Sequence, residues 1–228
     1  MARTPGPATP TDAPVAAATC VEAVETFFAP LLASLARSAD AIAPLFDGPP
    51  IASDIVLREV EPRARDVLAA GPAVGAGFVV IPGLLSDLTH LLAWWQGDAG
   101  ERMAESAALV QSAEYAHQEW FRTPLRTGEV HVTGPYVDYV CTDEFVLTTT
   151  LPVVRAGRPL GVMGVDVLAE TLERVLAPTF IAAGATLVNH HSRAAVSGDP
   201  TVFAGDRIDR SAFALALPCA GLPLTVLA

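Results

Sequence analysis

The segment from Glu144 to Val167 places the tightest limit on what this chain can fold into. It reads EFVLTTTLPVV, then RAGR, then PLGVMGVDV. Both outer runs are rich in β-branched and other apolar residues, and a short glycine-containing link between two such runs is typical of a β-hairpin. We therefore expect two neighbouring antiparallel strands here, in a fold that is built around an antiparallel sheet.

Helices are expected before the sheet. Apolar residues recur three and four places apart from Val15 to Ile42, which predicts an amphipathic helix. Pro30 lies inside this pattern, so that either the helix kinks there or two helices abut. A second helix is predicted from Ser53, as its N-cap, to Gly71. The strand-like segments 75–83 and 88–98 are separated by a turn, and we expect them to pair.

The remaining segments alternate between helix and strand signals. An apolar face from 101 to 120 predicts a helix that Pro124 ends, and a short helix is expected at 168–176. The segment 184–200 has the pattern of another hairpin, and 213–228 contains two strand-like pieces. Helices followed by a mostly antiparallel sheet with one helical insertion define an α+β fold class.

This order predicts a simple domain organisation. We expect a flexible tail at 1–14, an N-terminal helical segment at 15–72 and a sheet domain at 73–228. The last part, about 184–228, is expected to complete the same sheet. The insertion at 96–143 should cover the concave side of that sheet.

Composition excludes several classes of function. The chain has 25 acidic residues against 14 basic ones, all of them Arg, and a formal charge of −11, which repels nucleic-acid phosphates. The absence of Lys removes a Schiff-base lysine and the lysine of a P-loop. At 51% apolar residues the chain is too apolar for disorder. We see no uninterrupted apolar run of about 18 residues, so no membrane span is expected.

No catalytic or metal-binding pattern stands out. Cys20, Cys141 and Cys219 are far apart without C-x-x-C spacing, and we interpret them as buried or idle thiols. His190 and His191 are adjacent on a predicted hairpin strand, where they would face opposite sides, and no carboxylate or Cys lies at ligand spacing. The motifs of hydrolases, zinc proteases and dinucleotide-binding folds are missing. The sequence therefore predicts no enzyme, no metal site and no cofactor.

Four short pieces in a fixed order carry a resemblance. They are EWF at 119–121, GPYVDY at 134–139, FVLTTTLPVV at 145–154 with a turn after it, and GVMGVDV at 161–167 leading into a helix. Over about 75–176 the sequence resembles the Cache family of sensor domains, which are extracytoplasmic or stand-alone ligand-binding modules. The resemblance implies a PAS-like antiparallel β-sheet with a long N-terminal helix and a helical insertion covering the ligand side.

The resemblance also implies a ligand site. In the amino-acid-binding branch of the family, an aromatic pair, a later Tyr and an Asp at the end of a strand contact the ligand. These positions match Trp120, Phe121, Tyr136 and Asp166. An Arg two places before the Trp clamps the ligand carboxylate in that branch, but here Gln118 stands in its place. A neutral amide cannot give the bidentate, charge-assisted grip of Arg.

Strand periodicity adds two candidates. Asp138 lies two places after Tyr136 and shares its side of the strand, so both could point into one cleft. Thr148 would offer a hydroxyl to a polar ligand if its side of the strand faces the cavity. Asp166 ends an apolar strand, and its carboxylate needs a partner, which is either a structural Arg or a cationic group of a ligand.

We therefore expect a small-molecule sensor module in signal transduction. The expected ligand is an amine-bearing or polyhydroxy metabolite and not a standard α-amino acid. Two alternatives remain open: a dimerisation or interaction module whose pocket is filled by its own aromatic residues, and a hydrolase without a recognised motif. The N-terminal helix is a candidate homodimer surface, and the sequence names no output partner. The chain as it stands predicts a cytoplasmic protein, and a fragment of a longer receptor would be extracytoplasmic.

Overall fold

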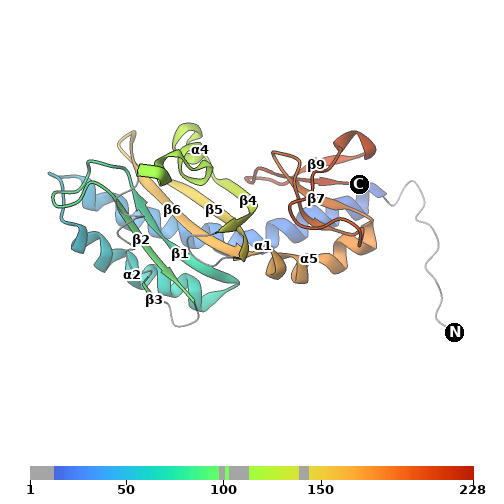
Figure 1. Ribbon diagram of the computed structural model, residues 1–228, viewed down its shortest axis with the longest axis horizontal. Coiled ribbons are helices and arrows are strands. Elements are labelled where there is room, and N and C mark those ends of the chain that lie inside the picture. The colour runs from blue at the N-terminus through green and yellow to red at the C-terminus, as the bar shows by residue number, and fades with distance from the viewer. Residues whose placement is uncertain (1–12, 98–100, 103–112, 139–143) are drawn as a thin grey trace. The chain divides into compact units, whose positions relative to one another are not determined.

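The structure is a computed structural model that describes residues 13–97, 101–102, 113–138 and 144–228 (Figure 1). These residues form two compact units, a large unit over Phe27–Thr171 and a small unit that combines residues 13–26 with Leu172–Ala228. The expected tail lies outside the described residues up to position 12, as does Cys141. The two units are described separately below.

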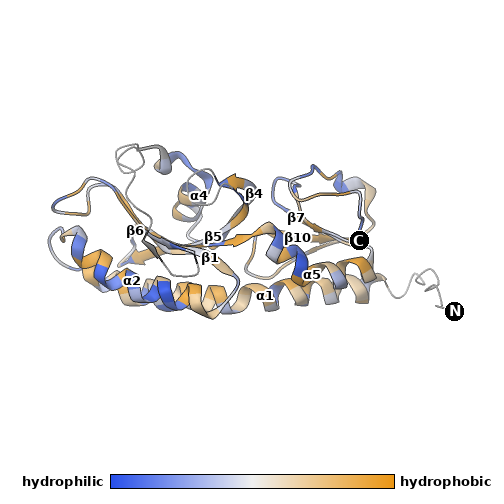
Figure 2. Cartoon of the chain, turned by 60° about the horizontal axis from the view of Figure 1, so that its bottom comes forward, coloured by the Kyte–Doolittle hydropathy of each residue, from blue (hydrophilic) through white to orange (hydrophobic). Residues whose placement is uncertain are grey.

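The predicted N-terminal helix is α1, Ala13–Ile42, and it is continuous through the exposed Pro30. The apolar stripe that predicted it is buried, including Val24, Phe28, Leu35 and Ile42. Ala13–Phe46 is long and apolar enough to cross a membrane by length and composition alone, and the expectation that the chain has no membrane span stays a prediction. Figure 2 shows hydrophobic residues along much of α1. A core helix near the N-terminus passes the same test, and the buried stripe gives the apolar residues of α1 a role in packing.

A short 3-10 helix, η1 (Ala43–Phe46), leads to α2, Ser53–Ala70. Ser53 is the first helical residue and not the N-cap that its sequence position suggested. Its backbone N–H and its hydroxyl both donate to the carboxylate of Asp87, at 2.9 and 2.8 Å. An acid from another part of the chain therefore satisfies the first turn of α2.

One six-stranded antiparallel sheet forms the centre of the large unit, in the order β3-β2-β1-β6-β5-β4. The predicted hairpin is β5 and β6, and the expected pairing of β1 with β2 is confirmed. The strands are β1 (Ala73–Val80), β2 (Leu91–Gln96), β3 (Glu101–Arg102), β4 (His131–Asp138), β5 (Glu144–Arg155) and β6 (Arg158–Leu168). The α+β class with a long N-terminal helix and an antiparallel sheet is confirmed.

The two sides of this sheet have different covers. Helix α2 packs on β1 and β2, whereas α4 (Glu119–Thr127) packs on β4, β5 and β6. We call these two faces the α2 side and the α4 side. On the α4 side, Val79 and Val162 form a buried cluster with Phe121.

The predicted helix at 101–120 is wrong where it is described. Glu101–Arg102 is a strand, residues 103–112 lie outside the described part, and a 3-10 helix, η2, covers Ala113–His117. The α-helix α4 starts at Glu119, close to the predicted C-terminal end at 120, because Gln118 before it is extended. It continues through Pro124, which was expected to end it. It ends at Gly128, whose φ of 74° closes the helix by a left-handed cap that most other residues adopt at a cost.

The small unit contains a second antiparallel sheet of its own, so the expectation that 184–228 completes the first sheet is wrong. Its strands, in the order β8-β7-β10-β9, are β7 (Thr186–Asn189), β8 (Ala194–Ser197), β9 (Ala216–Pro218) and β10 (Leu224–Leu227). The helix predicted at 168–176 is longer, α5 (Ala169–Ala183), and a short helix η3 spans Arg210–Ala212.

The buried side chains of the small unit come from helix and sheet together. The thiol of Cys20 in α1 lies 3.7 Å from the backbone oxygen of Thr179 in α5, and Cys20 and Cys219 are both buried free thiols. His190 and His191 lie in the turn after β7, where their ring centroids are 3.9 Å apart. The prediction that they face opposite sides of a strand is therefore wrong, because alternation applies only to extended backbone.

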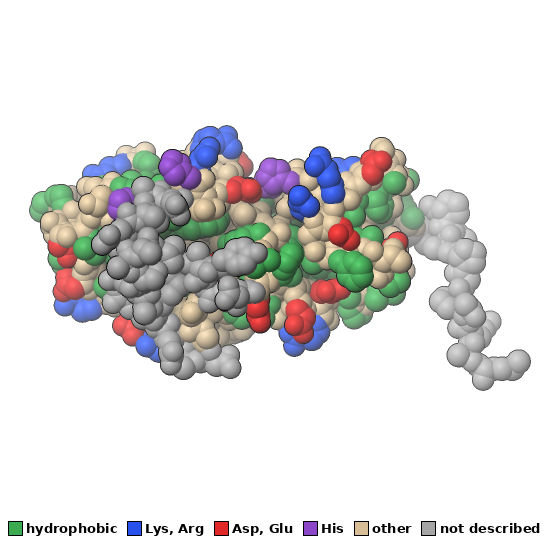
Figure 3. Space-filling view, viewed as in Figure 1, with side chains coloured by type: hydrophobic (Ala, Val, Ile, Leu, Met, Phe, Trp, Pro, Cys, Tyr) green, Lys and Arg blue, Asp and Glu red, His purple; other side chains and the backbone are tan. Residues whose placement is uncertain are grey.

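Acidic and basic side chains are interspersed on the described surface of each unit that Figure 3 draws. The formal net charge of −11 repels nucleic-acid phosphates, and the absence of a nucleic-acid partner stays a prediction.

Replacing Gly77 in the centre of β1 with Ala should destabilise the fold. An added Cβ there would lie 2.1 Å from the backbone oxygen of Ala93 and 2.8 Å from the Cα of Trp94, so that two paired strands would have to separate. Overpacking of this kind costs roughly 1–3 kcal/mol, and urea denaturation should show it as a lower midpoint. Gly48→Ala is the control, because its added Cβ meets nothing within 4 Å. Equal stability of the two variants would contradict the tight packing of β1 on β2.

Candidate functional site

The register of the sheet decides which side chains share the α4 side. Side chains alternate along each strand, and directly paired residues project to the same side. Gly77 pairs with both Trp94 and Gly164, and Asp166 pairs with both Gly75 and Thr148. The polar and small residues on the α4 side therefore include Gly75, Gly77, Trp94, Gln96, His131, Thr133, Tyr136, Asp138, Glu144, Thr148, Thr150, Gly164 and Asp166.

Three of the predicted site residues form one chain of hydrogen bonds. The hydroxyl of Thr148 donates to Oδ1 of Asp166 at 2.6 Å. The hydroxyl of Tyr136 lies 2.7 Å from the same Thr148 oxygen. Because Thr148 has a single proton and gives it to Asp166, Tyr136 donates to Thr148. The chain crosses three neighbouring strands, β4, β5 and β6, and it ends on a carboxylate.

Burial dominates the electrostatics of Asp166. Its side chain is 3% exposed, and this desolvation raises the pKa of the carboxyl from 3.8 to about 7. The hydrogen bond from Thr148 lowers the pKa, and the negative charge of Asp138 raises it again. Asp138 is itself buried on the α4 side, at the end of β4. A cation placed near Asp166 would offset the cost of burying its charge.

Trp94 forms a flat floor beside this pair of acids. The indole ring lies against three glycines, Gly75, Gly77 and Gly164. A Cβ added at any of them would lie 2.7 to 3.0 Å from the nearest atom of the ring. The position at Gly75 is 2.7 Å from the indole Nε1 and 3.0 Å from Oδ2 of Asp166. The indole therefore covers the space that three missing side chains leave, and its N–H end is the end near Asp166.

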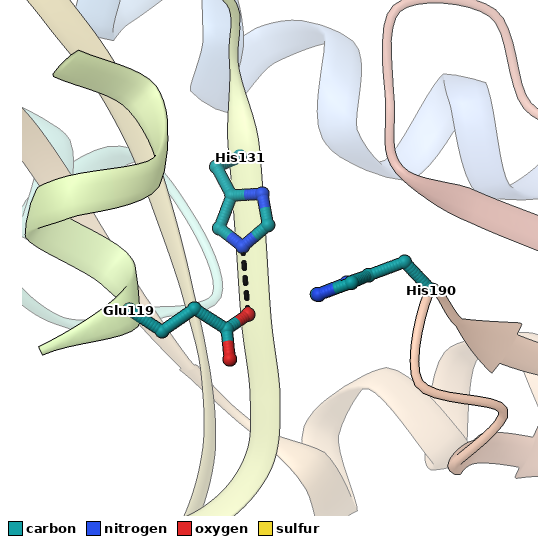
Figure 4. A group of neighbouring side chains, drawn as sticks. All are labelled: Glu119, His131 and His190. Carbon is teal, nitrogen blue, oxygen red and sulfur yellow. Dashed lines mark hydrogen bonds and ion pairs between the residues drawn. The ribbon is translucent and has the colours of Figure 1, made fainter. Parts of the chain in front are cut away.

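A second polar contact joins the covering helix to the sheet. Nε2 of His131 on β4 lies 2.8 Å from Oε1 of Glu119 on α4 (Figure 4). The His131 side chain is buried, and Glu119 is the first residue of its helix, where a carboxylate is favoured by the helix dipole. This bond fixes the start of α4 against β4, directly before the predicted aromatic pair Trp120 and Phe121.

The predicted residues are not all brought together. Tyr136, Asp138, Thr148 and Asp166 share the α4 side of the sheet. Phe121 is buried in the cluster with Val79 and Val162, and Trp120 is partly buried against that cluster. Gln118 is exposed just before α4, which separates it from the buried polar chain.

Sequence reasoning did not select Trp94 and missed His131. Period two shows only that at most one of the neighbouring residues Trp94 and Trp95 can reach a cavity, and the register shows that it is Trp94. The sequence did contain a signal for the position of Trp94. Gly75 and Gly77 alternate in an otherwise apolar strand, and glycine within a strand often marks the close approach of another group.

Residues 71–174 match the family model described as the first PDC sensor domain of methyl-accepting chemotaxis protein-like proteins. Solved structures at low sequence identity share the fold. The ligand-binding domain of the *Campylobacter jejuni* chemoreceptor Tlp3, in complex with L-valine, has a TM-score of 0.65 and 16% identity, and the match covers 95% of this chain and 90% of that chain.

Two further structures are similar over most of the chain. The ligand-binding domain of the amino acid chemoreceptor PctC of *Pseudomonas aeruginosa* PAO1, in complex with GABA, has a TM-score of 0.53 and 20% identity, covering 94% of this chain and 96% of that chain. The extracellular domain of a protein described as a histidine kinase, mmHK1S-Z3, has a TM-score of 0.60 and 16% identity, covering 91% and 78%. Residues 71–174 are therefore similar to a PDC sensor domain, which agrees with the resemblance to the Cache family, and the chain shares the fold of chemoreceptor ligand-binding domains.

Proposed function

We propose that this sensor domain binds a small molecule that carries an ammonium group, and that Asp166 accepts that group. The observation that supports the proposal is the buried carboxylate of Asp166, which ends the hydrogen-bond chain from Tyr136 and Thr148. A carboxylate kept in a sheet interior at a cost in free energy is well suited to a cationic partner. The ligand would lie on the α4 side of the six-stranded sheet.

The charges around Asp166 favour an amine over other ligand classes. Asp138 is buried on the same side and adds negative potential at Asp166. No arginine is among the α4-side positions given above. A neutral polyol would gain hydrogen bonds but would leave the buried charge of Asp166 without an opposite charge, so an amine fits better than a polyol.

A standard α-amino acid fits this side less well. Its carboxylate needs a cation or several strong donors, and Gln118 is neutral and exposed where the amino-acid-binding relatives are expected to carry an Arg. Tlp3 and PctC were solved with L-valine and GABA, both of which carry an ammonium group. We propose that this chain shares the ammonium part of such recognition and differs at the other end of the ligand.

The signalling role follows from differential affinity. A ligand that contacts both the sheet and α4 favours the arrangement in which both contacts are made, and it shifts the population toward that arrangement. We propose an extracytoplasmic location, which the sensor family and the extracellular domain of mmHK1S-Z3 support in preference to a cytoplasmic one. Dimerisation through α1 remains a proposal, as does a separate output partner.

Asp166→Asn should weaken the binding of amines while the fold persists. The amide keeps the shape of the side chain but removes the charge that pairs with ammonium, and a hydrogen bond to a charged group contributes roughly 1.5–3 kcal/mol. We expect affinity to fall about tenfold to a hundredfold. A thermal-shift screen of amines, amino acids, polyols and carboxylates would identify the probe, since a ligand at about 100 times its Kd adds about 2.7 kcal/mol. Calorimetry with the strongest hit would then compare the two proteins.

Asp54→Asn serves as the matched control. Asp54 is exposed on α2, where it pairs with Arg58 at 3.0 Å, and its loss should leave amine affinity unchanged. If Asp166→Asn bound the same amine as tightly as the unaltered protein, Asp166 would not be the ammonium acceptor. If no amine bound at all, the closed interaction module would be the better account.

The stability of the ligand-free protein should fall as pH rises between about 4 and 7. The folded pKa of Asp166, about 7, lies above its ordinary value of 3.8, so the folded state holds a proton that the unfolded state has already released. The stabilising contribution is complete below pH 3.8 and is lost as pH rises through 7. Urea denaturation across this range should show a smaller decline for Asp166→Asn than for the unaltered protein. A decline of equal slope in both proteins would assign it to other groups.

A further inference from the structure

We propose that Trp94 is a specificity-determining residue, whose indole N–H donates to a neutral hydrogen-bond acceptor that the ligand carries next to its ammonium group. The ligand class is then a vicinal amino alcohol or an α-amino amide. This inference rests on the proposed function, because Asp166 supplies the ammonium partner. It adds a second recognition point that determines what the amine is attached to.

The position of Trp94 is fixed by three glycines. Its ring atoms Cζ3 and Cη2 lie 3.1 and 3.0 Å from where the Cβ of residue 164 would stand, and Cε3 lies 2.9 Å from that of residue 77. At the opposite end of the ring, Nε1 lies 2.7 Å from where the Cβ of residue 75 would stand. Any larger side chain at these positions would displace the ring. The sequence therefore holds the indole flat on the sheet with its polar atom at the Asp166 end.

The indole N–H of Trp94 is a buried donor without an acceptor among the described residues. Trp94 is 5% exposed, and its Nε1 atom has no hydrogen-bond partner in the described part of the chain. Leaving such a donor unpaired costs free energy, which a ligand acceptor would recover. Nε1 of Trp95 is also unpaired there, so the missing partner alone does not identify a ligand contact.

The surroundings distinguish the two tryptophans. Trp95 pairs with Ala76 on the α2 side of the sheet, where Val165 is the next neighbour. Nε1 of Trp94 instead lies close to Oδ2 of Asp166, since both atoms are within 3.0 Å of the same point above Gly75. A donor and a carboxylate side by side complement a ligand that offers an acceptor and an ammonium side by side.

The acceptor is neutral for an electrostatic reason. Asp138 and Asp166 are both buried on the α4 side, and no arginine is among the α4-side positions defined above. A carboxylate of the ligand at Nε1 would meet the negative potential of both acids in a poorly screened environment. A hydroxyl or amide oxygen accepts the same hydrogen bond without that repulsion.

A pair of isosteric amines tests the inference. 1-Amino-2-propanol and isobutylamine differ in one hydroxyl in place of one methyl group, so their affinity ratio isolates the hydrogen bond. We expect the unaltered protein to bind the amino alcohol about fivefold to tenfold more tightly by calorimetry, as one neutral hydrogen bond allows. Trp94→Phe removes the N–H and should bring this ratio close to one. Alaninamide should also bind more tightly than alanine.

Trp95→Phe is the matched control, because it removes an equally buried and unpaired N–H from the α2 side. It should leave the ratio unchanged. A ratio that survives in Trp94→Phe, or a ratio near one in the unaltered protein, overturns the role of Trp94 while Asp166→Asn still reports on the proposed function. Tighter binding of alanine than alaninamide overturns the neutral acceptor. If neither amine binds, the inference fails, and the proposed function fails with it only if no amine of the thermal-shift screen binds either.

An NMR measurement covers the case in which Trp94→Phe does not fold. The chain has 3 Trp, so a nitrogen-labelled sample gives few indole N–H signals. The signal of Trp94 is assigned by elimination, with Trp95→Phe and a variant of Trp120. 1-Amino-2-propanol should move this signal downfield and isobutylamine should leave it nearly in place. An equal response to both amines contradicts the proposed hydrogen bond.

Discussion

The burial of one carboxylate, that of Asp166, is the constraint on which the rest of this site depends. A charged group in a sheet interior needs hydrogen bonds or an opposite charge, or it takes up a proton. Thr148 and Tyr136 supply hydrogen bonds from two neighbouring strands. On the other side of Asp166 the protein places Gly75, which leaves room for Oδ2 and for the indole of Trp94. One residue on each of four other strands, namely Gly75, Trp94, Tyr136 and Thr148, therefore lies beside this acid or bonds toward it.

The strands of the large sheet could be predicted because local signals agreed with the fold. Alternation, the glycine turn at 157 and the apolar segment after Gly71 all indicated antiparallel neighbours, and the pairs β1–β2 and β5–β6 form as expected. The insertion could not be predicted as well. Its apolar spacing suggested a helix up to Trp120, but the strong stop signal lies at Gly128, whose left-handed backbone ends α4. The separate sheet of the small unit was missed because short strands carry no information about which sheet they join.

The site could be predicted only in part. Tyr136, Asp138, Thr148 and Asp166 share one side of the sheet. Period two suggests this for Tyr136 and Asp138, which lie on one strand, and the resemblance implied Tyr136 and Asp166. Trp94 depends on a different kind of information, which is the pairing of β2 with β1 and the absence of side chains at the paired positions. Such long-range register is decided by tertiary packing, and no local pattern around Trp94 contains it.

The raised pKa of Asp166 gives the sensor a physical difference between its free and bound states. Near neutral pH the free site shares its population between protonated and ionised carboxyl, because burial opposes the charge. An ammonium ligand selects the ionised form, so that its binding is coupled to release of a proton whenever the pH is below the free-state pKa. The change in charge therefore occurs on β6, which is one strand from Thr148 on β5 and two strands from Tyr136 on β4. The contact between Glu119 and His131 connects β4 to the covering helix α4. A rearrangement of the polar chain that moved β4 would then reach α4 through a direct bond, and a ligand that favours one arrangement of the two elements would shift the population toward it.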